Sequence, residues 1–274
     1  MAVISAADVA KLRKVTLAGM MDCKKALEES EGNFDKAIEI IRKKGQAVAN
    51  KRADREATEG VVIAKTAGKL GVLIVLNSET DFVAKNADFT GLADKIADLA
   101  IKNNPANLEA LLALPLEGTT VGEKVIEYIG IIGEKLELSY YQKIEAEHVQ
   151  AYIHPGSRLA TIVGFTKAGI DEQVYKDVAM QVAAMAPVAL DKDSVPENVI
   201  AQELEIGKEQ ARRDGKPEDM LDKIAQGKLT KFFKESTLLN QDFIKDNKIT
   251  ISQYLQSIDK ALTVTGFIRY TLNL

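Results

Sequence analysis

Side chains suited to covalent or acid–base chemistry are scarce in this sequence, which holds one cysteine and two histidines, His148 and His154. A thiolate can act as a nucleophile and an imidazole as a general base. Cys23, however, lies within a helical apolar pattern, where a small buried thiol is the common outcome. His154 stands at an expected strand end in YIHPGSR, where a structural imidazole is favoured. No phosphate-binding G-x-x-x-x-G-K-[ST], no G-x-S-x-G and no metal-ligand spacing occurs. We therefore expect a protein that is not an enzyme and needs no cofactor or metal.

The segment NSETDFVAKN, residues 77–86, combines an acid with a large aromatic side chain among small polar residues. It follows the apolar run KLGVLIVLN, which predicts a buried strand. Asp81 can only accept hydrogen bonds when ionised, and Phe82 can bury a large ring against a partner. A plain connector rarely exposes a phenylalanine to water, so the residue types alone leave the role of this segment open. The alternative is that Phe82 folds back and anchors the loop on its own core.

Length, composition and charge set the broad class of the protein. The chain has 274 residues, of which 46% are hydrophobic, enough for about two domains with a sizeable core. The formal charge of −4 is spread along the chain, which argues against binding nucleic acid. No apolar run reaches the roughly 18 residues of a membrane span, and the start MAVISAADVAKLRK resembles neither a signal nor a transit peptide. We expect a soluble cytoplasmic protein with no nucleic-acid or membrane partner.

The first 45 residues predict three short helices. Ser5 and Asp8 have the spacing of a capping box at the start of the first helix, and Asn33 suits the N-cap of the third. Gly45 is expected to end the third helix. The apolar positions that share a face are Val9, Leu12 and Val15 in the first helix, Met20, Cys23 and Leu27 in the second, and Phe34, Ala37, Ile38 and Ile41 in the third.

The adjacent methionines of the second helix suggest a contact surface. Met20 and Met21 cannot share one helix face, so if Met20 points inward, Met21 points substantially outward. Both could serve as soft packing, or they could form an adaptable apolar surface, which thioethers do well. Arg13, which lies off the apolar face of the first helix, would border such a surface. Residues 46–60 then predict a solvated linker or a lone polar helix.

The centre of the chain predicts a duplicated unit of two strands and a helix. Leu73-Ile74 aligns with Ile162-Val163 in the strands. The helix positions that correspond are Phe89, Leu92, Ile96 and Leu99 in the first copy and Tyr175, Val178, Val182 and Met185 in the second. The loop between strand and helix is longer in the first copy, and its extra length contains the 77–86 segment. Helices around 107–134 and a strand around 136–146 are expected between the copies.

Residues 191–235 predict two highly charged antiparallel helices that project from the body. Gly215 is placed as the stop of the first and Pro217 as the opening residue of the second. The apolar residues expected to face each other are Val199, Ile200 and Leu204 on one side and Met220, Leu221, Ile224 and Phe232 on the other. The chain should then return through a helix near 252–258 to a last strand, VTGFIRYTL.

Four segments, LRKVTLAGMMDCKKAL, TDFVAKN, YIHPGSR and the closing VTGFIRY, resemble the elongation factor Ts family, the guanine-nucleotide exchange factors of bacterial elongation factor Tu. The similarity runs in order from about residue 5 to the end. It implies an α+β fold with a three-helix ubiquitin-associated-like domain, a duplicated α/β core and a protruding antiparallel coiled-coil hairpin. The expected boundaries are 1–45 for the helical domain, 46–60 for a linker, 61–146 for the first core subdomain, 147–190 with 236–274 for the second, and 191–235 for the hairpin.

The resemblance also implies a partner and the residues that contact it. Elongation factor Tu, GDP-bound or nucleotide-free, is the implied partner, with a higher-order assembly possible through the hairpin. Its Mg²⁺ and phosphate site would be disturbed, so that GDP leaves and GTP can bind, by Thr80, Asp81, Phe82 and Val83. The N-terminal contacts would be Arg13, Met20 and Met21. Gln181 stands where some relatives carry a partner-contacting histidine.

The sequence departs from the family pattern at further places, and two other functions remain open. Leu17 replaces a usual glycine, so the turn before the second helix is expected to differ in shape. Some relatives continue past the last strand into a further helix, whose contacts cannot be transferred. A helical adaptor that binds peptides would leave nucleotide release unchanged. An enzyme using Cys23 or His154 would lose activity when these residues are substituted.

Overall fold

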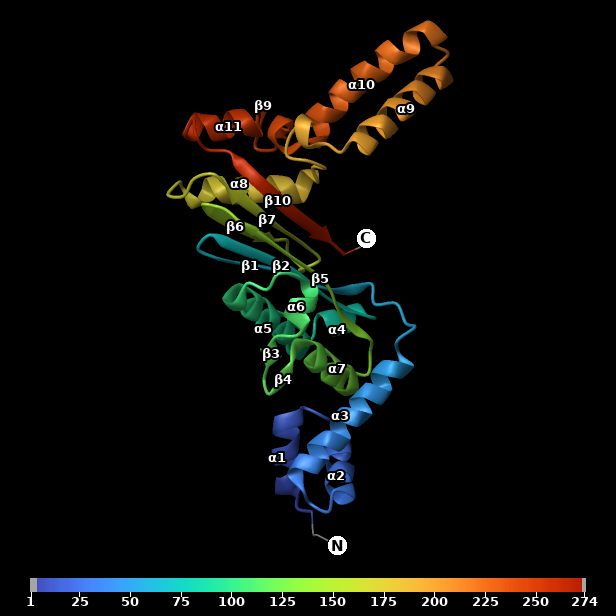
Figure 1. Cartoon of the computed structure of the whole chain (residues 1–274), viewed down its shortest axis with the longest axis vertical. Helices are drawn as coiled ribbons and strands as arrows, with labels where there is room; N and C mark the ends of the chain where they lie inside the picture. Colours follow the sequence, from blue (N-terminus) through green and yellow to red (C-terminus); the bar gives the residue numbers. More distant parts are fainter. Residues whose placement is uncertain (1–3, 273–274) are drawn as a thin grey trace. The chain divides into compact units, whose positions relative to one another are not determined.

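The computed structural model describes residues 4–272, which form an α+β protein of two compact units (Figure 1). The first unit comprises the residues up to Ile63, Ile74–Gln142 and the last residues from Thr271. The second comprises Ala64–Leu73 and Lys143–Tyr270. Residues 1–3 and 273–274, which the sequence assigns to the first and last predicted domains, lie outside the described residues. Among residues 4–272, no helix has both the length and the apolar character needed to cross a membrane.

The first unit begins with three helices, α1 (Ala6–Thr16), α2 (Met20–Glu29) and α3 (Phe34–Lys51). The predicted caps are confirmed: the Ser5 hydroxyl accepts from the Asp8 N–H at 3.1 Å, and the Asn33 side chain accepts from the Lys36 N–H at 3.0 Å. The small core between the helices includes Leu12, Cys23, Leu27 and Ala37. Val15 is exposed, so its expected place in the core is wrong. It lies in the last turn of α1, just before the turn into α2.

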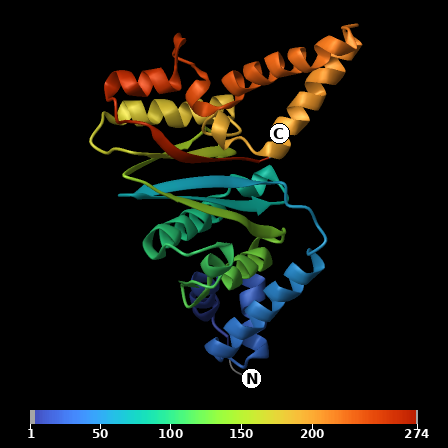
Figure 2. The same ribbon diagram turned by 45° about the horizontal axis from the view of Figure 1, so that its top comes forward.

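Helix α3 does not end at Gly45, as the sequence predicts, but runs on to Lys51. Figure 2 shows it as one continuous helix. Gly45 is buried against Gly130 of α7 (Val121–Ile132), and a Cβ atom added to Gly130 would lie only 2.5 Å from the Gly45 Cα. The glycine that resembles a helix stop is therefore the point where two helix backbones touch. Residues 46–51, expected as a linker or a lone polar helix, are the last turns of α3.

The first sheet has the order β1-β2-β5, formed by β1 (Glu59–Ala67), β2 (Leu70–Ser78) and β5 (Leu136–Glu145). The short helix α4 (Asp81–Ala84) and the longer α5 (Ala87–Asn103) follow β2. Helix α5 buries Phe89, Leu92 and Ile96, as predicted. Helix α6 (Leu108–Leu112) and a hairpin of β3 (Pro115–Leu116) and β4 (Thr119–Thr120) lead to α7.

The second unit repeats this arrangement. Strands β6 (His148–Ile153) and β7 (Leu159–Phe165) pair antiparallel, and β10 (Val264–Thr271) completes a sheet of order β10-β7-β6. Helix α8 (Glu172–Met185) packs on the β6–β7 pair through Tyr175, Val178 and Val182. In both sheets the second strand of the hairpin is central and is followed by the helix. This shared order is what a duplicated α/β unit requires.

A pair of antiparallel helices, α9 (Glu197–Arg213) and α10 (Leu221–Ser236), extends the second unit. The two helices pack tightly at Gly207, where an added Cβ would lie 3.1 Å from the Ala225 Cα, and Lys208 pairs with Asp222 at 2.9 Å. Pro217 precedes a short 3-10 turn rather than opening α10, which begins at Leu221, so that expectation is wrong. The chain returns through a 3-10 turn, β8 (Asp242–Phe243), β9 (Asp246–Thr250) and α11 (Ile251–Ile258).

The contact between Gly45 and Gly130 predicts that an alanine at Gly130 destabilises the protein, whereas an alanine at a glycine outside the contact does not. Gly130→Ala should destabilise the protein by about 1–3 kcal/mol, because its methyl group would overlap the α3 backbone. Gly91→Ala is the matched control, since a Cβ on this α5 residue meets nothing within 4 Å. It should raise stability by about 0.5–1 kcal/mol through helix propensity alone. Urea unfolding followed by helical circular dichroism checks both, and equal effects would contradict the close contact.

Candidate functional site

The segment with Asp81 and Phe82 forms a single short turn of helix, α4, that projects an aromatic ring into solvent. Thr80 is its N-cap and accepts a hydrogen bond from the Val83 N–H at 3.5 Å. Phe82 is 81% exposed and does not fold back onto the core. Asp81 pairs with Lys85 at 2.6 Å, and this hydrogen bond holds the pKa of the Asp81 carboxyl below its ordinary value. The turn therefore presents an ionised carboxylate and a free ring side by side.

Two glutamates support this turn from neighbouring segments. The Glu134 carboxylate accepts from the Thr80 N–H at 3.0 Å and from the Thr80 hydroxyl at 2.7 Å. Glu79 accepts from the Lys135 N–H at 2.6 Å and from Arg52 Nη1 at 2.9 and 3.0 Å. Burial alone would raise the pKa of Glu79, but the Lys135 N–H and the Arg52 guanidinium outweigh it, so the pKa lies below its ordinary value. No local sequence pattern pointed to Glu134 or Arg52, because both contacts are long-range.

A groove of about 340 Å³ joins this turn to the N-terminal helices within the first unit. Its lining combines side chains from the α1–α2 turn, from α4 and from α7 with Asn86 and Asp88, and includes Leu17, Phe82, Val83, Tyr128 and Ile131. Sequence reasoning named the N-terminal helices and the 80–83 segment separately. The structure brings Leu17 and Phe82 to the same groove.

The N-terminal residues expected to contact a partner lie on the surface. Met20 and Met21 are 55% and 63% exposed, so neither methionine packs into the small helical core. Arg13 is exposed in the last turn of α1, and its carbonyl accepts from the Leu17 N–H at 2.7 Å. Leu17 has a φ of 57°, a left-handed conformation that glycine adopts without steric cost. The turn thus has a backbone that a glycine there could also adopt, and it carries an apolar side chain into the groove.

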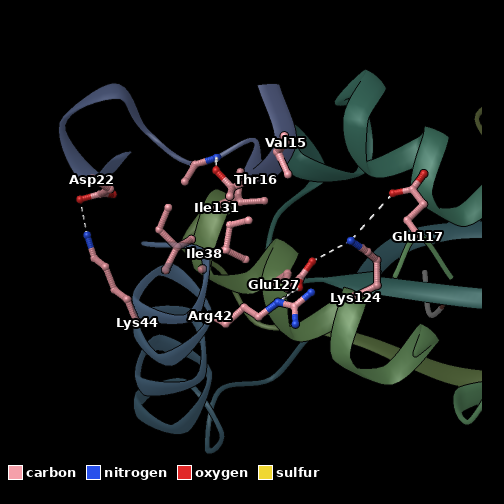
Figure 3. A pocket seen from close by; sticks show the side chains of 14 residues that line it. Val15, Thr16, Asp22, Ile38, Arg42, Lys44, Glu117, Lys124, Glu127 and Ile131 are labelled. Atoms are coloured by element: carbon pink, nitrogen blue, oxygen red, sulfur yellow. Dashed lines mark hydrogen bonds and ion pairs between the residues drawn. The ribbon is translucent and has the colours of Figure 1, made fainter. Parts of the chain in front are cut away.

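A second, more enclosed cavity of about 120 Å³ lies between the α1–α2 turn, α3 and α7. Figure 3 shows its lining, with Ile38 and Ile131 in its middle and Thr16 near the α1–α2 turn. Charged side chains of α3 and α7 border it. Its size suits a few atoms only, so it is a gap in packing between helices rather than a substrate pocket.

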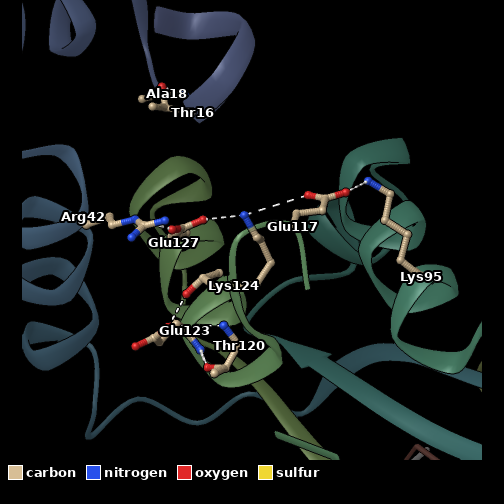
Figure 4. Close-up of polar contacts among 10 residues, drawn as sticks. Thr16, Ala18, Arg42, Lys95, Glu117, Thr120, Glu123, Lys124 and Glu127 are labelled. Carbon is tan, nitrogen blue, oxygen red and sulfur yellow. Dashed lines mark hydrogen bonds and ion pairs between the residues drawn. The ribbon is translucent and has the colours of Figure 1, made fainter. Parts of the chain in front are cut away.

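The charged border of this cavity is a chain of alternating charges (Figure 4). Arg42 contacts Glu127 at 2.8 Å, and Glu127 contacts Lys124 at 2.7 Å. Lys124 approaches Glu117 at 3.9 Å, and Glu117 contacts Lys95 at 2.6 Å. The Lys95 hydrogen bond lowers the pKa of Glu117. Each cation in this chain faces an acid, so the cluster connects α3, α7, α5 and the β3–β4 turn rather than offering a charge to a ligand.

Gln181 lies in the second unit and is fully buried. Its Nε2 donates to the Gln241 side-chain oxygen at 3.2 Å and to the Asp242 carbonyl at 3.1 Å, while its Oε1 accepts from the Ile244 N–H at 3.0 Å. The side chain thus joins α8 to the segment around β8. Because the side chain is buried, a direct contact between Gln181 and a partner would require this segment to move.

The residues weighed for catalysis do not form a reactive arrangement. Cys23 is buried, with its sulfur 3.7 Å from the Ala18 carbonyl oxygen. His154 contacts the Tyr152 hydroxyl through Nδ1 at 3.0 Å. Within residues 4–272, no group of three or more His, Cys, Asp or Glu side chains could hold a metal ion. The residues around Phe82 instead combine an exposed ring with a groove that other apolar side chains also line.

Comparison with known proteins supplies the family. A family model described as Elongation factor TS matches residues 79–273. An elongation factor Ts from Porphyromonas gingivalis is 54% identical over 97% of this chain and 97% of its own. The chain belongs to the elongation factor Ts family. A member from Flavobacterium psychrophilum is 51% identical over 99% of this chain and 100% of its own, and one from Cytophaga hutchinsonii is 50% identical over 100% of both. These elongation factor Ts relatives therefore extend the similarity across the N-terminal helices.

The lowered pKa of Glu79 predicts a specific acid sensitivity. Its stabilising contribution is fully present above the unfolded value of 4.5 and is lost as the pH falls through the lower folded value. Glu79→Gln should remove this part of the pH dependence. Unfolding free energies measured from about pH 7 to about pH 3 should show wild type and variant converging below about pH 4.5. The exposed Glu109 of α6, as Glu109→Gln, is the control, and a difference independent of pH would contradict the assignment.

Proposed function

We propose that this chain is the guanine-nucleotide exchange factor of elongation factor Tu and promotes release of bound GDP. Membership of the elongation factor Ts family supports the partner. The observation that carries the proposal is Phe82, a ring that is 81% exposed on a turn fixed by hydrogen bonds and lines the same groove as Leu17. An exposed ring in a supported position is suited to insertion into another protein. The chain would catalyse no covalent step.

The proposed mechanism acts on the metal and phosphates rather than on the nucleotide pocket itself. GDP is bound largely through backbone amides around its phosphates, with Mg²⁺ neutralising charge. Octahedral Mg²⁺ tolerates little displacement of its ligands and waters. Thr80 to Val83 would enter beside this site, Phe82 burying its ring between partner side chains and Asp81 competing for hydrogen bonds. The metal and GDP would then leave together, and GTP could bind.

Asp81 is already paired with Lys85, and this pairing does not prevent such a role. Both side chains are substantially exposed, and an exposed i,i+4 pair contributes little stability. Lys85 can therefore release the carboxylate when the turn enters a partner. Until then it keeps the carboxylate ionised and oriented along the turn.

Exchange needs a wide interface because the coupling is reciprocal. If this protein weakens GDP binding by some factor, GDP weakens binding of this protein by the same factor. Each tenfold change corresponds to about 1.4 kcal/mol, so a change of several powers of ten needs more interface than one turn of helix supplies. Arg13, Met20 and Met21 would add contact area next to the groove. Gln181 would contribute only through the segment around β8 that it fixes.

The remaining parts of the chain are assigned by the same proposal. Helices α1–α3, of which α3 runs on to Lys51, would form a ubiquitin-associated-like domain. The residues that follow, up to 60, would link it to a core of residues 61–146 and of 147–190 with 236–274. Helices α9 and α10, within residues 191–235, would form a coiled coil that offers a surface for higher-order assembly. The protein would work in the cytoplasm, in translation elongation.

Phe82→Ala should slow stimulated GDP release while leaving the protein folded. Removing a ring that is buried at an interface costs about 2–4 kcal/mol, which corresponds to a loss of roughly thirtyfold or more. The measurement is the dissociation rate of labelled GDP from elongation factor Tu with and without each variant. Wild-type protein that failed to accelerate release would overturn the proposed function itself.

The control for this prediction is Ile258→Ala, which truncates an exposed apolar side chain of the second unit. It should leave stimulated release unchanged. Circular dichroism of both variants checks the fold. Equal losses in Phe82→Ala and Ile258→Ala would point to a general effect of surface hydrophobicity instead of insertion.

Magnesium should modulate the effect of Asp81. If the turn acts by displacing Mg²⁺ from the partner, then removing Mg²⁺ with a chelator already produces part of the loss of GDP affinity that the turn causes. Asp81→Ala should therefore reduce stimulated GDP release strongly in excess Mg²⁺ and weakly in chelator, because perturbations that converge on one site are not additive. The measurement is the rate of GDP dissociation from elongation factor Tu with the native or the Asp81→Ala protein, each in excess Mg²⁺ and in chelator. These four rates form a thermodynamic cycle. Full additivity would refute displacement of the metal while leaving exchange activity in place.

A further inference from the structure

Helix α4 has no fully buried side chain to anchor it. It spans four residues, Asp81–Ala84, none of which is buried. A helix of this length does not form by itself in water, since nucleation is unfavourable and there are too few hydrogen bonds to offset it. Burying the side chain of Phe82 in the core would be the usual solution, but this ring is in solvent. Apart from the partly buried Val83, which lines the groove, the turn is held by polar contacts.

Glu134 supplies the most direct of these contacts. Its two oxygens accept from both donors of Thr80, the N–H at 3.0 Å and the hydroxyl at 2.7 Å. Because the hydroxyl gives its only proton to Glu134, its lone pairs face the Val83 N–H, which donates to it at 3.5 Å. The same carboxylate thus fixes the N-cap residue and orients its capping atom. Hydrogen bonds to a charged group are stronger than neutral ones.

The position of Glu134 is set by the end of α7. Helix α7 stops at Gly133, whose φ of 81° turns the chain back at a conformation that suits glycine. Glu134 follows at once and reaches Thr80, and the N–H of Lys135 reaches Glu79. Two consecutive residues after α7 therefore bind two consecutive residues before α4.

The other contacts of the turn are weaker or local. The Asp81–Lys85 pair is exposed and lies within the turn itself, so it cannot fix the turn to the body. The Ser78 hydroxyl donates to the Thr80 carbonyl at 2.9 Å, which restrains the same residue from the strand side. Glu134 is the contact that joins the N-cap to a separate element.

We infer that Glu134 is a positioning residue for nucleotide exchange: it preforms the turn that carries Asp81 and Phe82, so that the ring enters the partner already oriented. This inference rests on the proposed exchange function. Preformed contact residues bind better because the entropy of ordering them is not lost on association. Without Glu134, the turn would be ordered only by the partner, and stimulated GDP release would fall.

The first test needs no partner. Amide hydrogen exchange of the full-length chain follows the N–H groups of Ala84, Lys85 and Asn86, which donate within the turn. Glu134→Ala should accelerate their exchange about tenfold or more relative to wild type, with the rest of the chain unchanged. Glu109→Ala, an exposed glutamate of α6, is the matched control and should change nothing. Unchanged exchange of these amides in Glu134→Ala would overturn the inference.

The second test measures GDP release from elongation factor Tu at saturating concentrations of each variant. Glu134→Ala should reduce the maximal stimulated rate about tenfold, and Glu109→Ala should not. The Thr80→Ser variant keeps the hydroxyl, and the Thr80→Val variant lacks it. Thr80→Ser should therefore stimulate GDP release from elongation factor Tu more strongly than Thr80→Val. In a Phe82→Ala background, Glu134→Ala should add little, because it acts through the ring.

The outcomes separate the two levels of the proposal. A full additive loss in the Phe82→Ala background would show that Glu134 acts through general stability and would overturn the inference. Fast amide exchange with undiminished GDP release would also overturn it. If wild-type protein itself does not accelerate GDP release, the proposed function fails and the inference fails with it. The hydrogen-exchange comparison still decides separately whether Glu134 orders the turn.

Discussion

The contact between the backbones of Gly45 and Gly130 sets the geometry of the first unit. Helices α3 and α7 can approach this closely because Gly130 carries no Cβ atom, which would lie 2.5 Å from the Gly45 Cα. Helix α3 extends beyond the contact to Lys51, next to Arg52. Helix α7 ends soon after it at Ile132, next to Gly133 and Glu134. Both helices therefore deliver, from one crossing point, the charged residues that bind Glu79 and Thr80.

The exposed aromatic ring and the polar contacts beneath it form one arrangement. A surface phenylalanine gains nothing from the core of its own protein, so its position depends on the backbone that carries it. That backbone is fixed by carboxylates which accept several donors each. The chain of charges from Arg42 to Lys95 joins the surrounding helices in the same way. The apolar ring faces solvent, and hydrogen bonds to carboxylates hold the backbone that carries it.

Features that depend on local chemistry could be predicted from the sequence. The caps at Ser5 and Asn33, the β1–β2 hairpin and the repeated strand–helix pattern all follow from neighbouring residues. Long-range features could not. Gly45 has the local features of a helix stop, and only its distant contact with Gly130 shows why the helix continues. The exposed ring at Phe82 was found because a phenylalanine in a polar loop is conspicuous, whereas the Glu134 contact leaves no local pattern.

The burial of Gln181 is a second feature that the local sequence does not predict. A polar residue on a helix can face solvent or complete a buried hydrogen-bond network, and both have the same local sequence. The difference lies in the segment around β8, whose backbone groups meet the amide. Position within a family pattern indicates where a residue lies along the helix but not whether its side chain reaches the surface.

The continuity of α3 has a consequence for how this protein can change over time. Each residue added to an α-helix rotates the downstream chain by about 100° and advances it by about 1.5 Å. One residue gained or lost between Gly45 and Arg52 would swing the guanidinium away from Glu79, although every side chain were kept. Replacements along the outer face of this segment leave the angle untouched. The stretch is therefore free to drift in composition but is fixed in length, whereas matched insertions in α9 and α10 only lengthen a pair of helices.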